Sequence, residues 1–204
     1  MPVSPPAVAL QPPTELRSRG AAAPTVRVDE RELAAVYTEH HAFVWRSLSR
    51  LGVDDGRVDD GVHDVFMVVA QRLHEFEGRA SMRTWLFAIA MRVAQSFRRD
   101  AARERARTTP LERAGEPVHS PHDGADAART LRRLLDRLDD DKRAVFVMAE
   151  LEGMTAPEIA QVIDAKLPTV YSRLRLAREE LERHVARAQA RDTDRPRGRE
   201  GRTP

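Results

Sequence analysis

The basic residues near the C-terminal end are the part of the sequence best suited to bind an anionic partner. Between Lys166 and Arg178 the chain has four basic residues, which include Arg173 and Arg175, and no acidic one. The guanidinium group is planar and permanently charged, so it can hold a phosphate or the edge of a guanine base. A basic run is also typical of a solvated helix face, so its position in the fold has to decide between these interpretations.

The elements predicted around this run favour DNA. Thr155 and Glu158 have the spacing of a helix capping box, with Pro157 in the first turn. This pattern predicts a short helix, a break at residues 164–166 and a long helix from Leu167. Together they form a helix-turn-helix unit, whose second helix normally lies in the major groove. Its buried stripe is predicted to consist of Val170, Leu174, Ala177, Leu181 and Val185.

Apolar residues at three- and four-residue steps predict helices in the rest of the chain. The expected helices cover 33–51, with Tyr37 on the apolar stripe and Gly52 as its end; 62–73; and 82–97, with Ser81 as its N-cap. Two further apolar stripes follow at 131–138 and 145–151, the second ended by Gly153. The fold class is therefore all-α. A three-helix domain is expected over 29–107 and a helix-turn-helix domain over 129–187, joined by a flexible Pro- and Gly-containing linker over 108–128. We expect disorder in the Pro/Ala-rich arm 1–28 and the Arg-rich tail 188–204.

The composition excludes some classes of function for this chain. The chain has 204 residues and no cysteine, which excludes disulfides, thiolate nucleophiles and Cys-ligated zinc. Basic and acidic residues number 34 and 32, and all basic residues except Lys142 and Lys166 are arginine. The codon bias of a GC-rich genome would give the same excess, so the total permits a nucleic-acid partner without requiring one. The local charges differ more: residues 57–75 carry a net −2 and residues 97–107 a net +3.

Nothing in the sequence indicates export or a membrane span. The N-terminus lacks a basic segment followed by an apolar one, which argues against a secretory signal. The longest apolar run, Val65–Ala70, is far shorter than the roughly 20 residues that span a bilayer. We therefore expect a soluble cytoplasmic protein.

Four segments, in this order, resemble the extracytoplasmic-function (ECF) group of sigma-70 family RNA polymerase sigma factors. DDGVHDVF (59–66) and FEGRASMRTWLFAIA (76–90) are similar to segments of the family's region 2. EGMTAPEIA (152–160) and TVYSRL (169–174) are similar to segments of region 4. The chain departs from the usual pattern at Gly61, where leucine is common, and at Asp164, where the turn usually has glycine.

The resemblance implies that the acidic second helix binds core RNA polymerase, at the clamp helices of the largest subunit. An acidic face with Asp60 and Asp64, beside Val65, suits a basic coiled coil. Acids in a first turn also favour the N-terminus of their own helix through its dipole, so this alternative stays open for Asp60. The expected polymerase-binding residues are Asp60, His63, Asp64, Met67 and Gln71.

The segment from Phe76 and the helix after it resemble the part of the family that captures an unpaired base of the minus-10 element. An unpaired base needs a stacking platform and hydrogen-bond partners. The expected minus-10 residues are Phe76, Arg79, Ser81, Arg83, Thr84 and Trp85, with Arg92, Arg98 and Arg99 following the strand's backbone. Core packing is the alternative for Trp85.

The long last helix is expected to bind the minus-35 duplex. Its candidate residues are Lys166, Thr169, Tyr171, Ser172, Arg173, Arg175 and Arg178. Arg175 could hold guanine with two hydrogen bonds, which is worth ~1–3 kcal/mol of discrimination, whereas Thr169 and Ser172 suit phosphate or shape contacts. A salt bridge to Glu158 or a neighbouring acid is the alternative for Arg173. The linker of about 21 residues has an r.m.s. span of ~25 Å, so the polymerase has to hold the domains apart.

Two other classes of function compete with this interpretation. A helix-turn-helix regulator that acts without polymerase would leave the region 2-like segments unexplained. A metal-dependent nuclease would have to use Asp54, Asp55, Asp59 and Asp60, with no further carboxylate or histidine converging on them. His63 and His74 lie ~16 Å apart along a helix, too far to share an ion. We therefore expect a non-catalytic protein without metal or cofactor, monomeric when free, with an anti-sigma factor as a further candidate partner.

Overall fold

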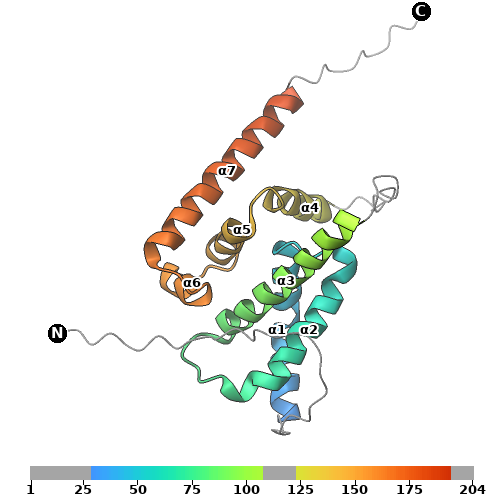
Figure 1. The fold of residues 1–204 in the computed structure, drawn as a ribbon, viewed down its shortest axis with the longest axis vertical. Coiled ribbons are helices and arrows are strands. Elements are labelled where there is room, and N and C mark those ends of the chain that lie inside the picture. Colours follow the sequence, from blue (N-terminus) through green and yellow to red (C-terminus); the bar gives the residue numbers. More distant parts are fainter. Residues whose placement is uncertain (1–28, 108–122, 194–204) are drawn as a thin grey trace, which may run out of the picture.

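The structure is a computed structural model that describes residues 29–107 and 123–193, and all regular elements in these ranges are helical (Figure 1). The first half comprises α1 (Glu30–Arg50), the 3₁₀ turn η1 (Asp55–Arg57), α2 (Val58–Arg72), the 3₁₀ turn η2 (Leu73–Glu75) and α3 (Met82–Arg107). The second half comprises α4 (Asp123–Leu135), α5 (Asp140–Phe146), the π-helical turn η4 (Val147–Leu151), α6 (Ala156–Val162) and α7 (Leu167–Thr193). The all-α prediction is confirmed.

Helices α1, α2 and α3 pack around one apolar core. Their facing stripes supply Leu48, Val65, Val69, Leu86 and Phe87, which are fully buried. α1 ends before Gly52, whose φ of +89° needs the freedom of glycine. At the start of α3 the backbone N–H of Thr84 donates to Ser81 Oγ at 3.1 Å, as predicted for an N-cap.

The second half forms the predicted helix-turn-helix. Thr155 and Glu158 make the expected capping box at the start of α6. The turn between α6 and α7 passes through Asp164, whose φ of +49° is a left-handed conformation that aspartate tolerates better than most side chains. This explains how the chain makes the turn without glycine. Val170 and Ala177 of α7 are fully buried against the helices before it.

The helices extend beyond the ranges expected from the sequence, as α3 does by continuing past residue 97 to Arg107. Two of the extensions enter segments expected to lack helix. α4 begins at Asp123, inside the segment expected to be a linker, and α7 continues past residue 188 to Thr193. Both extensions contain alanines, which are strong helix formers. The C-terminal part of α7 runs beyond the helices it packs against (Figure 1), so Val185, predicted to be buried, is 37 % exposed. The predictions for residues 1–28, 108–122 and 194–204 lie outside the described residues.

The two halves pack against each other. α6 lies beside α3, and α4 approaches α1 (Figure 1). None of the helices in the described part of the chain is long and apolar enough to cross a membrane.

Candidate nucleic-acid interface and protein-docking face

One face of α2 presents the five residues expected to bind polymerase. All five are exposed, and each lies three or four positions from at least one other, so they form a single stripe along the helix: Asp60, His63, Asp64, Met67 and Gln71. Met67 is 48 % exposed, which is unusual for a large apolar side chain. Val65, expected beside these residues, is instead fully buried in the core. We call the five residues the α2 face.

Two aromatic residues of α1 lie near this helix and were not predicted to be exposed. Tyr37 is 45 % exposed, and its ring lies 4.7 Å from that of Phe66 on α2. Trp45 is 37 % exposed, and its indole N–H donates to Asp59 Oδ1 at 3.0 Å. Periodicity assigned Tyr37 to the buried stripe because an aromatic residue at helical spacing is usually core. Two exposed aromatic side chains of α1 therefore contact α2, at Phe66 and Asp59.

Gly61 has a steric role on the opposite side of α2. A Cβ at this position would lie 3.2 Å from Leu48 Cδ1 of α1, closer than ordinary contacts. Glycine thus lets α1 and α2 approach closely and leaves the exposed α2 face unchanged. This explains why the chain has glycine at position 61, where leucine is common in the sequences it resembles.

The aromatic residues expected to hold an unpaired base lie together. The rings of Phe76 and Trp85 are 5.4 Å apart and inclined at 48°. Both are half-buried, and Trp85 packs against the core while keeping part of its ring accessible. Thr84 does not belong to this surface, because it is buried and its hydroxyl lies 2.8 Å from Ser81 Oγ. Its expected contact with DNA is therefore withdrawn, and its role is to complete the cap of α3.

The arginines of the same region differ in their surroundings. Arg79 and Arg99 are exposed, and Arg79 pairs with Glu77. Arg92 is partly buried, and burial together with the nearby charge of Arg72 lowers the pKa of its guanidinium. Arg83 and Arg98 point toward the second half of the chain and form ion pairs with Glu152 and Asp140 there. Without the buried Thr84, the expected minus-10 residues form a discontinuous surface, in which Arg79, Arg83 and Arg98 are already engaged in ion pairs.

The start of α7 carries the residues expected to bind the minus-35 duplex. Lys166, Tyr171, Ser172, Arg175 and Arg178 are exposed, while Thr169 and Arg173 are partly buried. Tyr171 is 59 % exposed, so its ring has no place in the core.

Each arginine of this surface has an acidic neighbour. Arg173 pairs with Asp141 at 2.5 Å, Arg175 with Glu179 at 2.5 Å and Arg178 with Glu150 at 2.5 Å. Glu158, the alternative partner named for Arg173, is instead held in the capping box. Because these pairs are mostly exposed, each contributes little to stability and can be exchanged for a phosphate.

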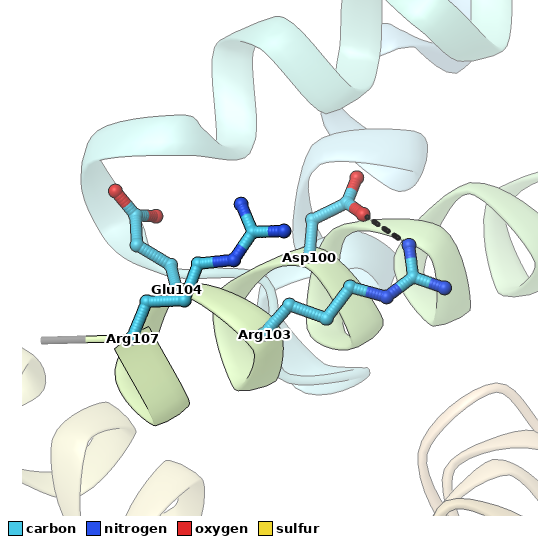
Figure 2. Close-up of a pocket in the computed structure, with 4 residues that line it drawn as sticks. All are labelled: Asp100, Arg103, Glu104 and Arg107. Carbon is cyan, nitrogen blue, oxygen red and sulfur yellow. Dashed lines mark hydrogen bonds and ion pairs between the residues drawn. The ribbon is translucent and has the colours of Figure 1, made fainter.

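The end of α3 carries a shallow depression lined by one helix only. Asp100, Arg103, Glu104 and Arg107 are all exposed, and Arg103 pairs with Asp100 at 3.4 Å (Figure 2). Alternating charges on one solvated helix offer neither an anion nor a cation site. Within residues 29–107 and 123–193, no three His, Asp or Glu side chains come together in a way that could hold a metal ion.

The capping box of α6 yields a pH-dependent prediction. The backbone N–H and hydroxyl of Thr155 donate to Glu158 Oε2 at 2.8 and 2.7 Å, and these bonds lower the pKa of the Glu158 carboxyl. A carboxyl with a lowered pKa stabilises the fold above its ordinary pKa and loses this effect as the pH falls through the lowered value. Thr155→Ala should therefore cost about 1 kcal/mol of unfolding free energy at pH 7 and less at pH 3.

Urea unfolding at the two pH values measures this difference. Thr130→Ala on the exposed side of α4 is the matched control and should change stability little. An equal cost of Thr155→Ala at both pH values would show that the bond from the Thr155 hydroxyl to the Glu158 carboxylate contributes nothing to stability.

Two family patterns match the chain in the order of its two halves. The pattern of Sigma-70 region 2 matches residues 36–104, and that of Sigma-70 region 4 matches residues 128–181. The ECF RNA polymerase sigma factor SigC of Mycobacterium tuberculosis is 32 % identical over 157 residues, which cover 74 % of this chain and 82 % of SigC. The ECF RNA polymerase sigma-E factor of Escherichia coli is 27 % identical over 145 residues, which cover 65 % of this chain and 76 % of sigma-E.

Solved structures share the fold. CnrH, in complex with the cytosolic domain of CnrY, superposes with a TM-score of 0.60 at 23 % identity, covering 78 % of this chain and 90 % of CnrH. The sigma factor RpoE of Bartonella quintana, in complex with the anti-sigma factor NepR, superposes with a TM-score of 0.60 at 21 % identity, covering 77 % of this chain and 96 % of RpoE.

Proposed function

Since this chain belongs to the ECF group of sigma-70 family RNA polymerase sigma factors, which are non-catalytic subunits that direct promoter recognition, we propose that each surface described above has one task in that process. The α2 face binds the clamp helices of core polymerase, the surface around Phe76 and Trp85 holds the opened minus-10 strand, and the start of α7 reads the minus-35 duplex. The observation that carries this assignment is that the acidic α2 face and the basic start of α7 are both exposed, on different halves of the chain.

The α2 face suits a basic coiled coil. Exposed carboxylates of Asp60 and Asp64 supply charge complementarity, and Met67 supplies apolar contact at the centre of the stripe. Charges of this kind steer association and set the register, whereas a central apolar residue excludes water.

The paired rings of Phe76 and Trp85 can take up a base that leaves the double helix. An aromatic platform is worth ~1–3 kcal/mol per stacked base and accepts any base. Specificity then requires hydrogen bonds, which we assign to Ser81 and to Arg83, once Arg83 exchanges Glu152 for DNA. Arg92, Arg98 and Arg99 lie further along α3 and provide cations for the backbone of the same strand.

The helix-turn-helix recognises the base sequence of the minus-35 duplex. Its exposed residues at the start of α7 would enter the major groove, with Arg175 on a guanine edge and Thr169 or Ser172 on phosphates. Arg173 and Arg178 would exchange their acidic partners for phosphates.

The proposed partners are core RNA polymerase, promoter DNA and an anti-sigma factor. The last follows from the solved relatives, since RpoE was crystallised with the anti-sigma factor NepR. We propose the cytoplasm as the site of action, because the polymerase and the promoter are there.

Binding of promoter DNA with and without core polymerase tests this proposal. A sigma factor should bind a promoter fragment strongly only when core polymerase is present. Under the same conditions it should bind unrelated DNA more weakly than the promoter fragment. Equally tight and specific binding by the chain alone would instead indicate a helix-turn-helix regulator that acts without polymerase.

A further inference from the structure

The three arginines expected to bind the minus-35 duplex differ in the origin of their acidic partners. Arg175 pairs with a glutamate four positions further along α7 itself. Arg173 pairs instead with Asp141 of α5. Arg178 pairs with Glu150 of η4. A pair within one helix is common on any solvated helix face, whereas a pair between two elements requires the fold to bring its side chains together.

The start of α5 holds Asp141 beside α7. The side chain of Asp139 caps α5 by accepting a hydrogen bond from the backbone N–H of Lys142 at 2.8 Å. The ammonium group of Lys142 bridges Asp139 and Glu180 of α7, at 2.9 and 2.8 Å. These bonds fix the first turn of α5 against α7, and the carboxylate of Asp141 lies 2.5 Å from the guanidinium of Arg173.

The π-helical turn η4 presents Glu150 to the same helix. Its Oε1 atom accepts two hydrogen bonds from Arg178, one from Nε at 2.9 Å and one from Nη2 at 2.5 Å. The two residues are 28 positions apart, so only the packing of η4 beside α7 brings them together. Single π-helical turns are rare and frequently occur at functional sites. Glu150 is thus a second acid that another element supplies to the basic surface of α7.

DNA can reach both of these pairs. The side chains of Arg173 and Arg178 are 30 % and 55 % exposed. Arg173 and Asp141 line a shallow depression between α5 and α7, together with the exposed side chain of Leu176. A carboxylate at such a place acts twice against a phosphate, because it occupies the guanidinium and also repels the incoming negative charge.

We propose that Asp141 and Glu150 are attenuating residues, which compete with DNA phosphates for the two arginines they pair with and so weaken the binding of region 4 to any duplex. This rests on the proposed function, which places these arginines on phosphates of the minus-35 duplex. Phosphate contacts carry no sequence information, so the acids lower affinity and leave the choice of sequence unchanged. Because phosphate contacts supply nearly all non-specific binding, the two acids limit the retention of region 4 on unrelated DNA.

Two amide variants remove the competing charges and keep the size of the side chains. These are Asp141→Asn and Glu150→Gln, made in the full-length chain. Glu182→Gln is the matched control, since Glu182 is an exposed acid of α7 that lies outside both pairs. It makes the same change in net charge and so reports the effect of charge alone. Circular dichroism checks that each variant keeps its helices.

Fluorescence anisotropy measures the binding of these chains to two labelled duplexes. One carries the minus-35 element of a promoter that the chain transcribes with core polymerase, and the other carries the same bases scrambled. Exposed ion pairs are weak, so each amide variant should bind about two- to fivefold more tightly than the Glu182→Gln chain, by the same factor on both duplexes. The decrease of log affinity with log salt concentration should also steepen, by up to ~0.9 for each arginine released.

A double-mutant cycle shows whether the gain depends on the paired arginine. Asp141→Asn should give no gain in an Arg173→Ala background, and Glu150→Gln should give none in an Arg178→Ala background. The inference is overturned if the variants show no gain, if the control shows an equal gain, or if the gain persists without the arginine. A gain confined to the unscrambled duplex would also overturn it, because competition for phosphates acts on every sequence.

The proposed function fails by a different result. A chain that directs no specific initiation with core polymerase would overturn its assignment to promoters. The competition would still be measured on the scrambled duplex, because phosphates are common to all sequences. The two failures are therefore distinguishable.

Discussion

Replacing Asp64 with arginine is expected to abolish stable binding to core RNA polymerase. Asp64 lies in the middle of the exposed α2 face, and arginine there would put a positive charge against the basic coiled coil proposed as its partner. Like charges brought together at an interface cost several kcal/mol, so affinity should fall by about a hundredfold or more. Titration of fluorescently labelled chain with purified core polymerase measures this loss.

Glu39→Arg is the control for Asp64→Arg. Glu39 is an exposed acid of α1 in the same domain, and its replacement makes the same change in net charge away from the α2 face. Its affinity for core polymerase should stay near that of the wild-type chain. Equal binding by the Asp64→Arg and wild-type chains would show that polymerase docks elsewhere.

The second large effect is expected at Arg175, where alanine should relax the choice of one minus-35 base pair. Arg175 is exposed near the start of α7 and pairs with Glu179 in a solvated contact, so it can turn toward a base at little cost. Loss of two hydrogen bonds to guanine should reduce discrimination at that position by ~1–3 kcal/mol, about 5- to 150-fold. Holoenzyme binding to a set of promoters that differ at each minus-35 position measures the effect.

Arg187→Ala is the matched control on α7, since Arg187 is exposed on the same helix, beyond the residues that the region 4 pattern matches. It should leave the base preference unchanged. If Arg175→Ala weakens binding to all the promoters by the same factor, then Arg175 contacts phosphate rather than a base.

Local patterns were sufficient to predict the helices and several of their ends. The capping box at Thr155, the N-cap at Ser81 and the turn at Gly52 each depend on residues a few positions apart, and all three are confirmed. The stripe of the α2 face follows from helical spacing in the same way. Tyr37 and Thr84 were mispredicted because spacing places a side chain on a helix but does not say what lies opposite it.

Contacts between distant segments could not be predicted from the sequence. Arg50 and Glu152 are 102 positions apart, and no periodicity connects them. Asp164 illustrates a smaller limit: the sequence indicated a break there, but only the φ angle explains how aspartate replaces glycine. The interface between the two regions depends on such long-range pairs, so only the structure reveals it.

Run-off transcription with purified core polymerase tests the central claim most directly. Added to core enzyme, this chain should direct initiation from specific promoters in its genome, including one upstream of its own gene, and core enzyme alone should not. Absence of specific initiation at every genomic promoter would contradict the assignment of this chain as a promoter-recognition subunit.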